Sequence, residues 1–216
     1  VATDKTALLE SLLEDRILLL DGAMGTQIQA LGLDERAVRC ERFADHHKDL
    51  KNFPDILCVT RPEAITEIHC RYLAAGADIV ETNTFGASPV GMEEFGLPPE
   101  MVREINAAAV ACALRARDEF SERTPDRPRF VAGSIGPTTK QTAISTKVED
   151  ASHRGTTFDE MAESYYQQVA ALVEAGVDIL LPETVIDTLN LKACLFAIAQ
   201  YFDESGVFVP VMVSGT

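Results

Sequence analysis

Residues 75–84, AGADIVETNT, and residues 175–184, AGVDILLPET, are two versions of one pattern. In each, a glycine and an aspartate precede a short apolar run, and polar residues follow it. A continuous apolar run is typical of a parallel strand that helices bury on both faces. Each run also follows a helical stretch, so the two segments form an internal repeat of strand and helix units.

Three further apolar runs end in the same way. They are ILLLDG (17–22), FVAGSIGP (130–137) and VPVMVSGT (209–216). Together the five runs predict an α/β fold with five parallel strands. Ligands of such folds bind beyond the carboxyl ends of the strands. The polar residues predicted to share that face are Asp21, Thr82, Asn83, Thr84, Ser134, Glu183 and Ser214.

Helices are predicted between these runs. Pro62 suits the first position of a helix and Gly76 its end, so residues 62–76 form the clearest one. Hydrophobic periodicity predicts four others, over 5–15, 99–122, 158–176 and 186–204. The segments 34–60 and 138–157 have weak periodicity and many turn formers, and they are predicted to be long loops.

Two architectures fit five parallel strands. A (β/α)8 barrel of the TIM type needs about 250 residues, so residues 1–216 are expected to be the N-terminal part of a single barrel domain, truncated to about strands 1 to 5. The alternative is a doubly wound five-stranded parallel sheet, which normally closes with a helix after its last strand. The two differ in strand order, since a barrel gives 1-2-3-4-5 and a doubly wound sheet reverses direction.

The composition excludes several classes of partner. A net charge of −15 and the lack of a Lys/Arg cluster argue against nucleic acid. No apolar run reaches the roughly 18 to 20 residues that span a membrane, so no membrane partner is expected. Five cysteines, an odd number without close spacing, indicate reduced thiols and predict a cytoplasmic location.

Asp21 and Glu183 are the strongest candidates for a ligand site. Each is the first ionisable residue after an apolar run, where a carboxylate needs a cation, a metal or several N–H donors. Together they could hold an ammonium group; alternatively, each caps a following helix. Gly22 and Gly25 flank a turn whose amides could bind a carboxylate or phosphate, or which is simply a tight turn. The turn lacks the spacing of nucleotide-binding loops.

Metal and nucleophile sites find little support in the sequence. No two cysteines or histidines have the close spacing of zinc ligands, so no metal site is predicted. Ser134 lies in GSIGP rather than in a nucleophile motif, and it is predicted to line the site. No catalytic residue is therefore predicted.

Six segments resemble one protein family in colinear order. They are LDGAMGTQIQ (20–29), ERFADHHKDLKNFPDILCVTRPEAI (41–65), AGADIVETNTFGA (75–87), RFVAGSIGPT (129–138), DILLPETVIDTLNLKA (178–193) and PVMVSGT (210–216). They resemble the homocysteine-binding domain of cobalamin-dependent methionine synthases. Homocysteine methyltransferases that use betaine or S-methylmethionine share part of this pattern and are the alternative, and a non-catalytic amino-acid-binding module is another.

The resemblance implies a barrel that transfers a methyl group from methylcobalamin, ultimately from methyltetrahydrofolate, to the zinc-bound thiolate of homocysteine. It implies that three cysteines at the ends of strands 6 and 8 hold the zinc, and that cobalamin and folate domains of the same polypeptide are the partners. This stretch alone is then expected to be inactive and to bind no cofactor. Asp21 and Glu183 would hold the substrate ammonium group, the Gly22 to Gly25 amides its carboxylate, and Asn83, Thr84 and Ser134 would line the pocket.

Overall fold

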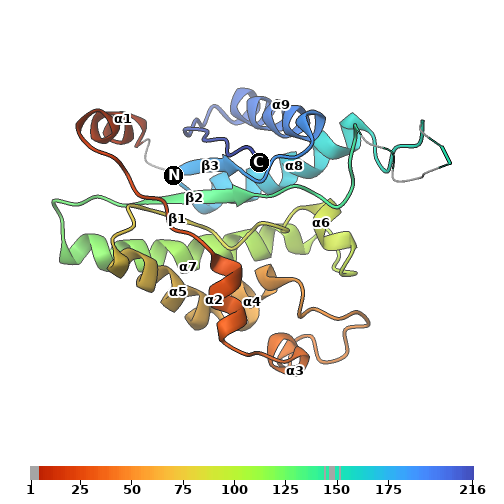
Figure 1. The fold of residues 1–216 in the computed structure, drawn as a ribbon, viewed down its shortest axis with the longest axis horizontal. Helices are drawn as coiled ribbons and strands as arrows, with labels where there is room; N and C mark the ends of the chain where they lie inside the picture. Colours follow the sequence, from red (N-terminus) through yellow and green to blue (C-terminus); the bar gives the residue numbers. More distant parts are fainter. Residues whose placement is uncertain (1–4, 144, 146–148, 151) are drawn as a thin grey trace.

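The structure is a computed structural model that describes residues 5–143, 145, 149–150 and 152–216. Its sheet has three parallel strands, β1 (Ile79–Glu81), β2 (Phe130–Ile135) and β3 (Ile179–Pro182), in the order β1-β2-β3 (Figure 1). The register pairs Val80 with Val131 and Gly133 with Leu180. The apolar runs at 78–84, 130–137 and 178–184 are therefore the three strands that were predicted there.

The two outer runs pair with this sheet without forming full strands. Leu20 bridges Ile79 on one side of the sheet, and Val211 bridges Leu180 on the other. Each outer run has a neighbouring strand on one side only, and the Ile17 side chain remains 84% exposed. The outer runs therefore gain too little burial to form regular strands. The five segments nevertheless lie in chain order across the sheet, which contradicts the reversed order of the doubly wound alternative.

Five helices occupy the predicted places. Helix α5 begins at Pro62 and ends before Gly76, whose φ of 112° is in the left-handed region that glycine favours. Helix α8 begins with a capping box between Thr157 and Glu160. The bounds are α1 (Thr6–Asp15), α5 (Pro62–Ala75), α7 (Met101–Arg123), α8 (Phe158–Ala175) and α9 (Thr188–Ser205). Helices α5, α7, α8 and α9 pack against one another in chain order.

Alternate residues of each strand face two different layers. Val80, Val131 and Leu180 belong to the core that α7, α8 and α9 complete. Ile79 and Phe130 belong to a separate cluster on the opposite face, which Leu9 of α1 joins. Because side chains alternate along a strand, the positions that follow Ile79 and Phe130 at even spacing also point to this second face.

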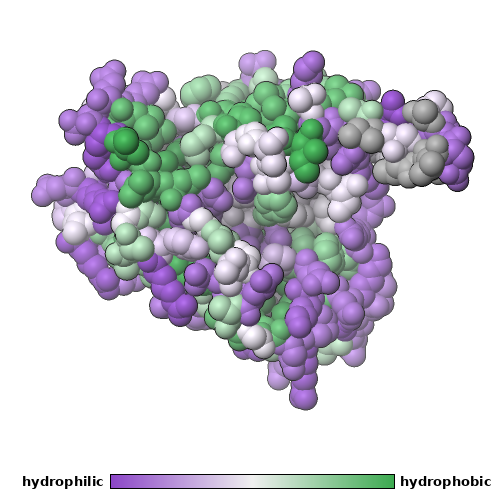
Figure 2. Space-filling view, viewed as in Figure 1, coloured by the Kyte–Doolittle hydropathy of each residue, from purple (hydrophilic) through white to green (hydrophobic). Residues whose placement is uncertain are grey.

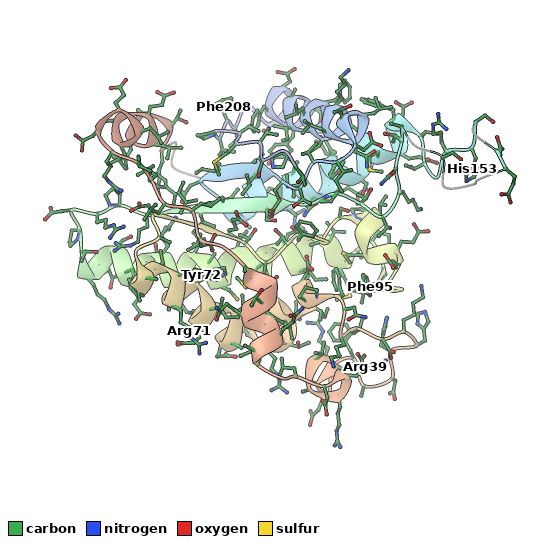
Figure 3. The ribbon with its side chains drawn as sticks, in the orientation of Figure 1. Arg39, Arg71, Tyr72, Phe95, His153 and Phe208 are labelled. Atoms are coloured by element: carbon green, nitrogen blue, oxygen red, sulfur yellow. The ribbon has the colours of Figure 1, made fainter. Side chains whose placement is uncertain are left out.

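The segment 34–60, predicted to be a long loop, is instead built of short helices: α3 (Glu35–Arg39), η1 (Pro54–Ile56) and α4 (Leu57–Thr60). Arg39, which is labelled in Figure 3, extends from α3. Its guanidinium group donates to the carbonyl oxygens of His46 and Lys48, at 2.6 and 2.8 Å. These helices are too short to be stable alone, and tertiary contacts form them. Two further short helices are α2 (Met24–Ala30) and α6 (Pro89–Glu93). The other predicted loop, 138–157, lies partly outside the described residues.

The aspartates of the repeat bind the neighbouring segment at the amino ends of β1 and β3. Asp78 accepts hydrogen bonds from the Leu19 amide at 3.0 Å and from the Arg16 guanidinium at 2.9 Å. Asp178 accepts one from the Val131 amide at 2.9 Å, and Arg117 pairs with it at 3.0 Å. Each aspartate therefore ties its own strand to the preceding segment, which explains why both copies of the repeat carry it.

Apolar side chains are exposed along the outer runs. Leu19 is 54% exposed, Phe208 57% and Val213 45%. Hydrophobic atoms gather over α1 and the segment after it in Figure 2. Among the described helices, none combines the length and the apolar character that crossing a membrane requires.

The buried side chain of His69, on α5, is expected to make the protein less stable at acidic pH. Its side chain is fully buried, and neither ring nitrogen has a hydrogen-bond partner among the described residues. Burial lowers the pKa of His69 from 6.5 to about 4, so the unfolded chain binds a proton below pH 6.5 that the folded chain takes up only near pH 4. We expect His69 to remove about 2 kcal/mol of stability between pH 7 and pH 5.

Denaturant unfolding of the wild type and of His69→Leu at both pH values checks this expectation. The variant should be the more stable one at pH 7, since leucine leaves no unpaired ring nitrogen, and it should lose less stability on acidification. Equal losses in the two proteins would show that His69 does not cause the step.

Candidate functional site

Three acidic residues lie near enough to affect one another's charge where the first apolar run, β1 and β3 end. Both carboxylate oxygens of Asp21 accept a hydrogen bond from the backbone amide of Glu81, at 3.1 Å from its nitrogen in each case. Burial raises the pKa of Asp21 to about 7, and the nearby charge of Glu183 adds to the shift. Burial likewise raises the pKa of Glu81 to about 8, with contributions from Glu183 and Asp21. None of the three forms an ion pair with a lysine or arginine in the described part of the chain.

The sequence patterns do not single out Glu81. It ends the apolar run DIVE and resembles the last residue of the strand rather than one of the polar residues after it. The alternation along β1 is the signal that could have found it, because Glu81 lies two residues after Ile79 and shares its face.

Ser134 joins this cluster through Glu183. The Ser134 hydroxyl donates to Oε1 of Glu183, and the Glu183 amide donates to the Ile135 carbonyl at 3.0 Å. The structure therefore brings together Asp21, Glu183 and Ser134 of the predicted residues, with Glu81 added. Ser214 lies beside β3, where its amide donates to the Pro182 carbonyl at 2.9 Å.

Thr82, Asn83 and Thr84 are engaged inside the fold. The hydroxyls of Thr82 and Thr84 are 2.7 Å apart, and Thr84 donates to the Ser134 carbonyl at 2.7 Å. The Asn83 amide donates to the Pro54 carbonyl at 2.8 Å. These bonds fix the end of β1 against β2 and η1. The contact of Asn83 and Thr84 with a ligand stays a prediction.

Gly22 and Gly25 lie in an open turn at the start of α2. A Cβ atom on either glycine would meet nothing within 4 Å, and both residues are exposed. There is therefore room for a ligand beside their amides, and a role for them in binding a carboxylate stays a prediction.

The capping alternative for Asp21 and Glu183 is wrong. Helix α2 has Ala23 at its N-cap, with no side-chain hydrogen bond. Helix α9 is capped by Asp187, whose carboxylate accepts the Leu189 amide at 2.8 Å. Neither Asp21 nor Glu183 caps the N-terminus of a described helix, so capping does not explain why these two half-buried carboxylates lie at the ends of the apolar runs.

Thr184, directly after Glu183, has a φ of 55°. A β-branched residue in the left-handed region is strained by about 1 to 3 kcal/mol. We expect Thr184→Gly to be more stable than Thr184→Ala by about 1 kcal/mol, since both variants remove the same hydroxyl and glycine alone relieves the strain. Thermal unfolding of the pair measures the difference; a less stable glycine variant would contradict it.

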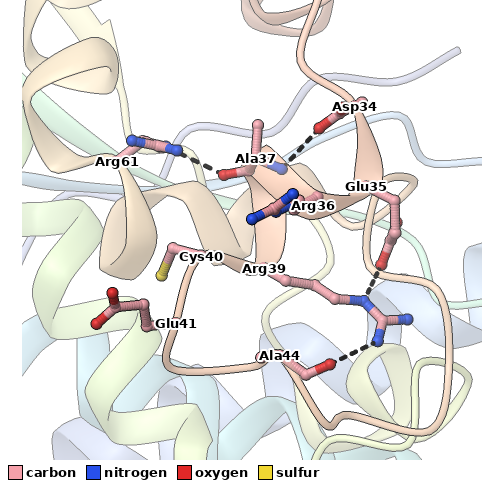
Figure 4. Close-up of a pocket in the computed structure, with 9 residues that line it drawn as sticks. All are labelled: Asp34, Glu35, Arg36, Ala37, Arg39, Cys40, Glu41, Ala44 and Arg61. Carbon is pink, nitrogen blue, oxygen red and sulfur yellow. Dashed lines mark hydrogen bonds and ion pairs between the residues drawn. The ribbon is translucent and has the colours of Figure 1, made fainter.

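Of two cavities, only one adjoins the site. One of about 90 Å³ adjoins Glu183 and is lined by Ile135, Tyr165 and Asn190 among others. Another, of about 870 Å³, opens beside α3 (Figure 4). In the second, Arg39 and Arg61 are held by carbonyl oxygens of Ala44 and Ala37. None of its lining residues comes from a strand end, so the carboxylate cluster remains the candidate site.

The described residues do not fit a zinc site with three thiolates. All five cysteines are free, and they lie on separate segments at Cys40, Cys58, Cys70, Cys112 and Cys194. No group of three or more His, Cys, Asp or Glu in the described part of the chain could hold a metal ion. These cysteines therefore cannot supply the set of ligands that the resemblance implies.

Comparison with known proteins defines the family. The family model for homocysteine S-methyltransferases matches residues 18–216, and the chain belongs to this family. The metallated homocysteine methyltransferase MmuM from Escherichia coli is similar, with 28% identity and a TM-score of 0.69 over 89% of this chain and 62% of that one. Its apo form gives 25% identity and a TM-score of 0.67, over 96% and 63% of the two chains. The chain thus spans less than two thirds of these structures.

Proposed function

We propose that this chain supplies the amino-acid end of the substrate pocket in a homocysteine S-methyltransferase, a part of a (β/α)8 barrel. The observation that carries the proposal is the cluster of Asp21, Glu81 and Glu183 without a cation. An ammonium group placed among them would supply the missing positive charge, and homocysteine carries one at neutral pH. Ser134 would keep the Glu183 carboxylate in place.

The methyl donor is proposed from two sequence segments. ERFAD (41–45) and ETVIDTLNLKA (183–193) favour a methionine synthase that uses methylcobalamin, with cobalamin and folate domains as partners. Betaine and S-methylmethionine remain the alternative donors, since the family match specifies no methyl donor. Zinc, with its thiolate ligands on strands 6 and 8, would activate the homocysteine sulfur, and the resemblance alone supports that assignment. A cytoplasmic location is proposed from the reduced cysteines.

A pair of ligands tests the ammonium site. Homocysteine and 4-mercaptobutanoate differ only in the amino group, so calorimetric titration of the complete protein with each isolates its contribution. We expect homocysteine to bind about 30-fold more tightly or better, which corresponds to about 2 kcal/mol. Equal affinities would place the amino group elsewhere and overturn the proposal.

The same titration has a defined pH dependence. A bound ammonium group favours the ionised form of Asp21 and Glu81, whose pKa values are about 7 and 8 without it. Binding therefore releases protons, and homocysteine affinity should rise as the pH increases through this range. The affinity of 4-mercaptobutanoate should not rise in this way, because it brings no cation.

A further inference from the structure

Two buried cysteines share a core cluster and a cavity outside the candidate site. Cys58 lies on α4 and Cys112 on α7, and the side chains are 1% and 4% exposed. Both side chains belong to the same buried core cluster, where α4 packs against α7. Cys112 also contacts the Pro62 carbonyl, at 3.5 Å from its sulfur. The described carboxylates of the site do not contact this pair, and the proposed function does not use it.

A cavity gives access to these thiols. It has a volume of about 350 Å³, and its lining includes both cysteines, Arg42 and Arg115. Arg42 pairs with Glu104, whereas Arg115 forms no ion pair with a described carboxylate. The cavity is large enough for a peroxide molecule, and a free guanidinium group stands at its wall.

The two thiols differ in acidity. The neighbouring Cys58 side chain lowers the pKa of Cys112, and the charge of Arg115 contributes. Burial raises the pKa of Cys58, which therefore stays protonated. Because the thiolate is the reactive form, Cys112 is the one that reacts first.

We propose that Cys58 and Cys112 are a redox modification site that closes to a reversible disulfide on reaction with hydrogen peroxide. The Cys112 sulfur attacks one peroxide oxygen, the O–O bond breaks, and a sulfenic acid and hydroxide form. The Cys58 sulfur then attacks the Cys112 sulfur, the S–S bond forms, and the sulfenic oxygen leaves with the Cys58 proton as water. The two thiols lose two electrons, and the peroxide is reduced to two molecules of water.

The disulfide would also act on the candidate site, an effect that rests on the proposed function. The Cys58 thiol donates to the Asn83 carbonyl at 3.6 Å, and the Asn83 amide approaches the Cys58 sulfur at 3.5 Å. Oxidation removes the S–H donor and draws the sulfur toward α7. Asn83 lies between Thr82 and Thr84 at the end of β1, so we expect oxidation to weaken homocysteine binding about threefold or more.

Peptide mapping of the complete protein tests the modification. After brief treatment with hydrogen peroxide, digestion without reductant should yield a linked peptide pair containing Cys58 and Cys112, and dithiothreitol should separate it. In Cys58→Ser, dimedone should label Cys112 as a sulfenic acid. Cys194→Ser is the matched control, since Cys194 is also buried and burial raises its pKa to about 12, and this variant should form the same linked pair.

Several outcomes overturn the proposal. Free Cys58 and Cys112 in the treated wild type, or a link from either to another cysteine, would do so even if the variants fail to fold. A linked pair with unchanged homocysteine affinity would reject only the coupling to Asn83. Failure of the reduced protein to bind homocysteine would reject the proposed function and leave the mapping result intact.

Discussion

Asp21→Asn and Glu183→Gln are each expected to lower kcat/KM for homocysteine by about 30-fold or more in the complete enzyme. Both substitutions keep the shape of the side chain and delete its charge. If the two carboxylates hold the substrate ammonium group, the loss of one leaves the bound cation short of a partner, which costs about 2 to 5 kcal/mol. The effect belongs to substrate binding, so the zinc content of the enzyme should not change.

Steady-state kinetics with zinc measured alongside decides this prediction. Asp34→Asn is a suitable control: Asp34 caps α3 by accepting the Ala37 amide at 2.7 Å, and asparagine caps a helix about as well as aspartate. Its kcat/KM should stay near that of the wild type. Values near wild type for Asp21→Asn and Glu183→Gln as well would mean that the substrate site lies elsewhere.

Gly136→Ala is expected to destabilise the protein by about 2 to 3 kcal/mol. A Cβ atom at Gly136 would lie 2.5 Å from the Phe85 carbonyl oxygen and 2.7 Å from its ring. The Gly136 amide also donates to that carbonyl at 3.1 Å, so the two backbones cannot separate without breaking the bond. The strain would fall on the ends of β1 and β2.

Gly215→Ala is the matched control for this change. A Cβ atom there would meet nothing within 4 Å, and the expected change in stability is small. Urea unfolding of both variants gives the comparison. Equal midpoints for Gly136→Ala and Gly215→Ala would show that the Phe85 segment moves aside freely.

The sequence predicted the elements whose signals are local. Helices α5 and α8 begin at a proline or a capping box and end at glycines of positive φ, and these residue types act through their own backbone. The short helices α3 and α4 could not be predicted in this way. Glu35, for example, accepts the amides of Leu50 and Lys51 from 15 and 16 residues away, and such contacts leave no periodic pattern.

The sequence predicted only part of the candidate site, because only some of its residues carry a local signal. Asp21 and Glu183 each follow an apolar run, and their position alone marks them. Glu81 resembles the last residue of an apolar run, and its place beside the other two becomes clear from the pairing of β1 with the first run. Whether Asn83 lines a pocket or holds η1 depends on the direction of its amide, which no sequence pattern specifies.

The number of residues between each acidic side chain and the aspartate at the start of its strand indicates the face on which that side chain lies. Glu81 follows Asp78 by three residues, and Glu183 follows Asp178 by five. Both intervals are odd, so the two glutamates project from the same side of the pleated sheet. The second copy is longer by two residues, one full repeat of the pleat, which moves Glu183 about 7 Å farther along its strand without turning it over. A duplicated unit can thus change the depth at which a carboxylate sits in a pocket, provided that its length changes by an even number of residues.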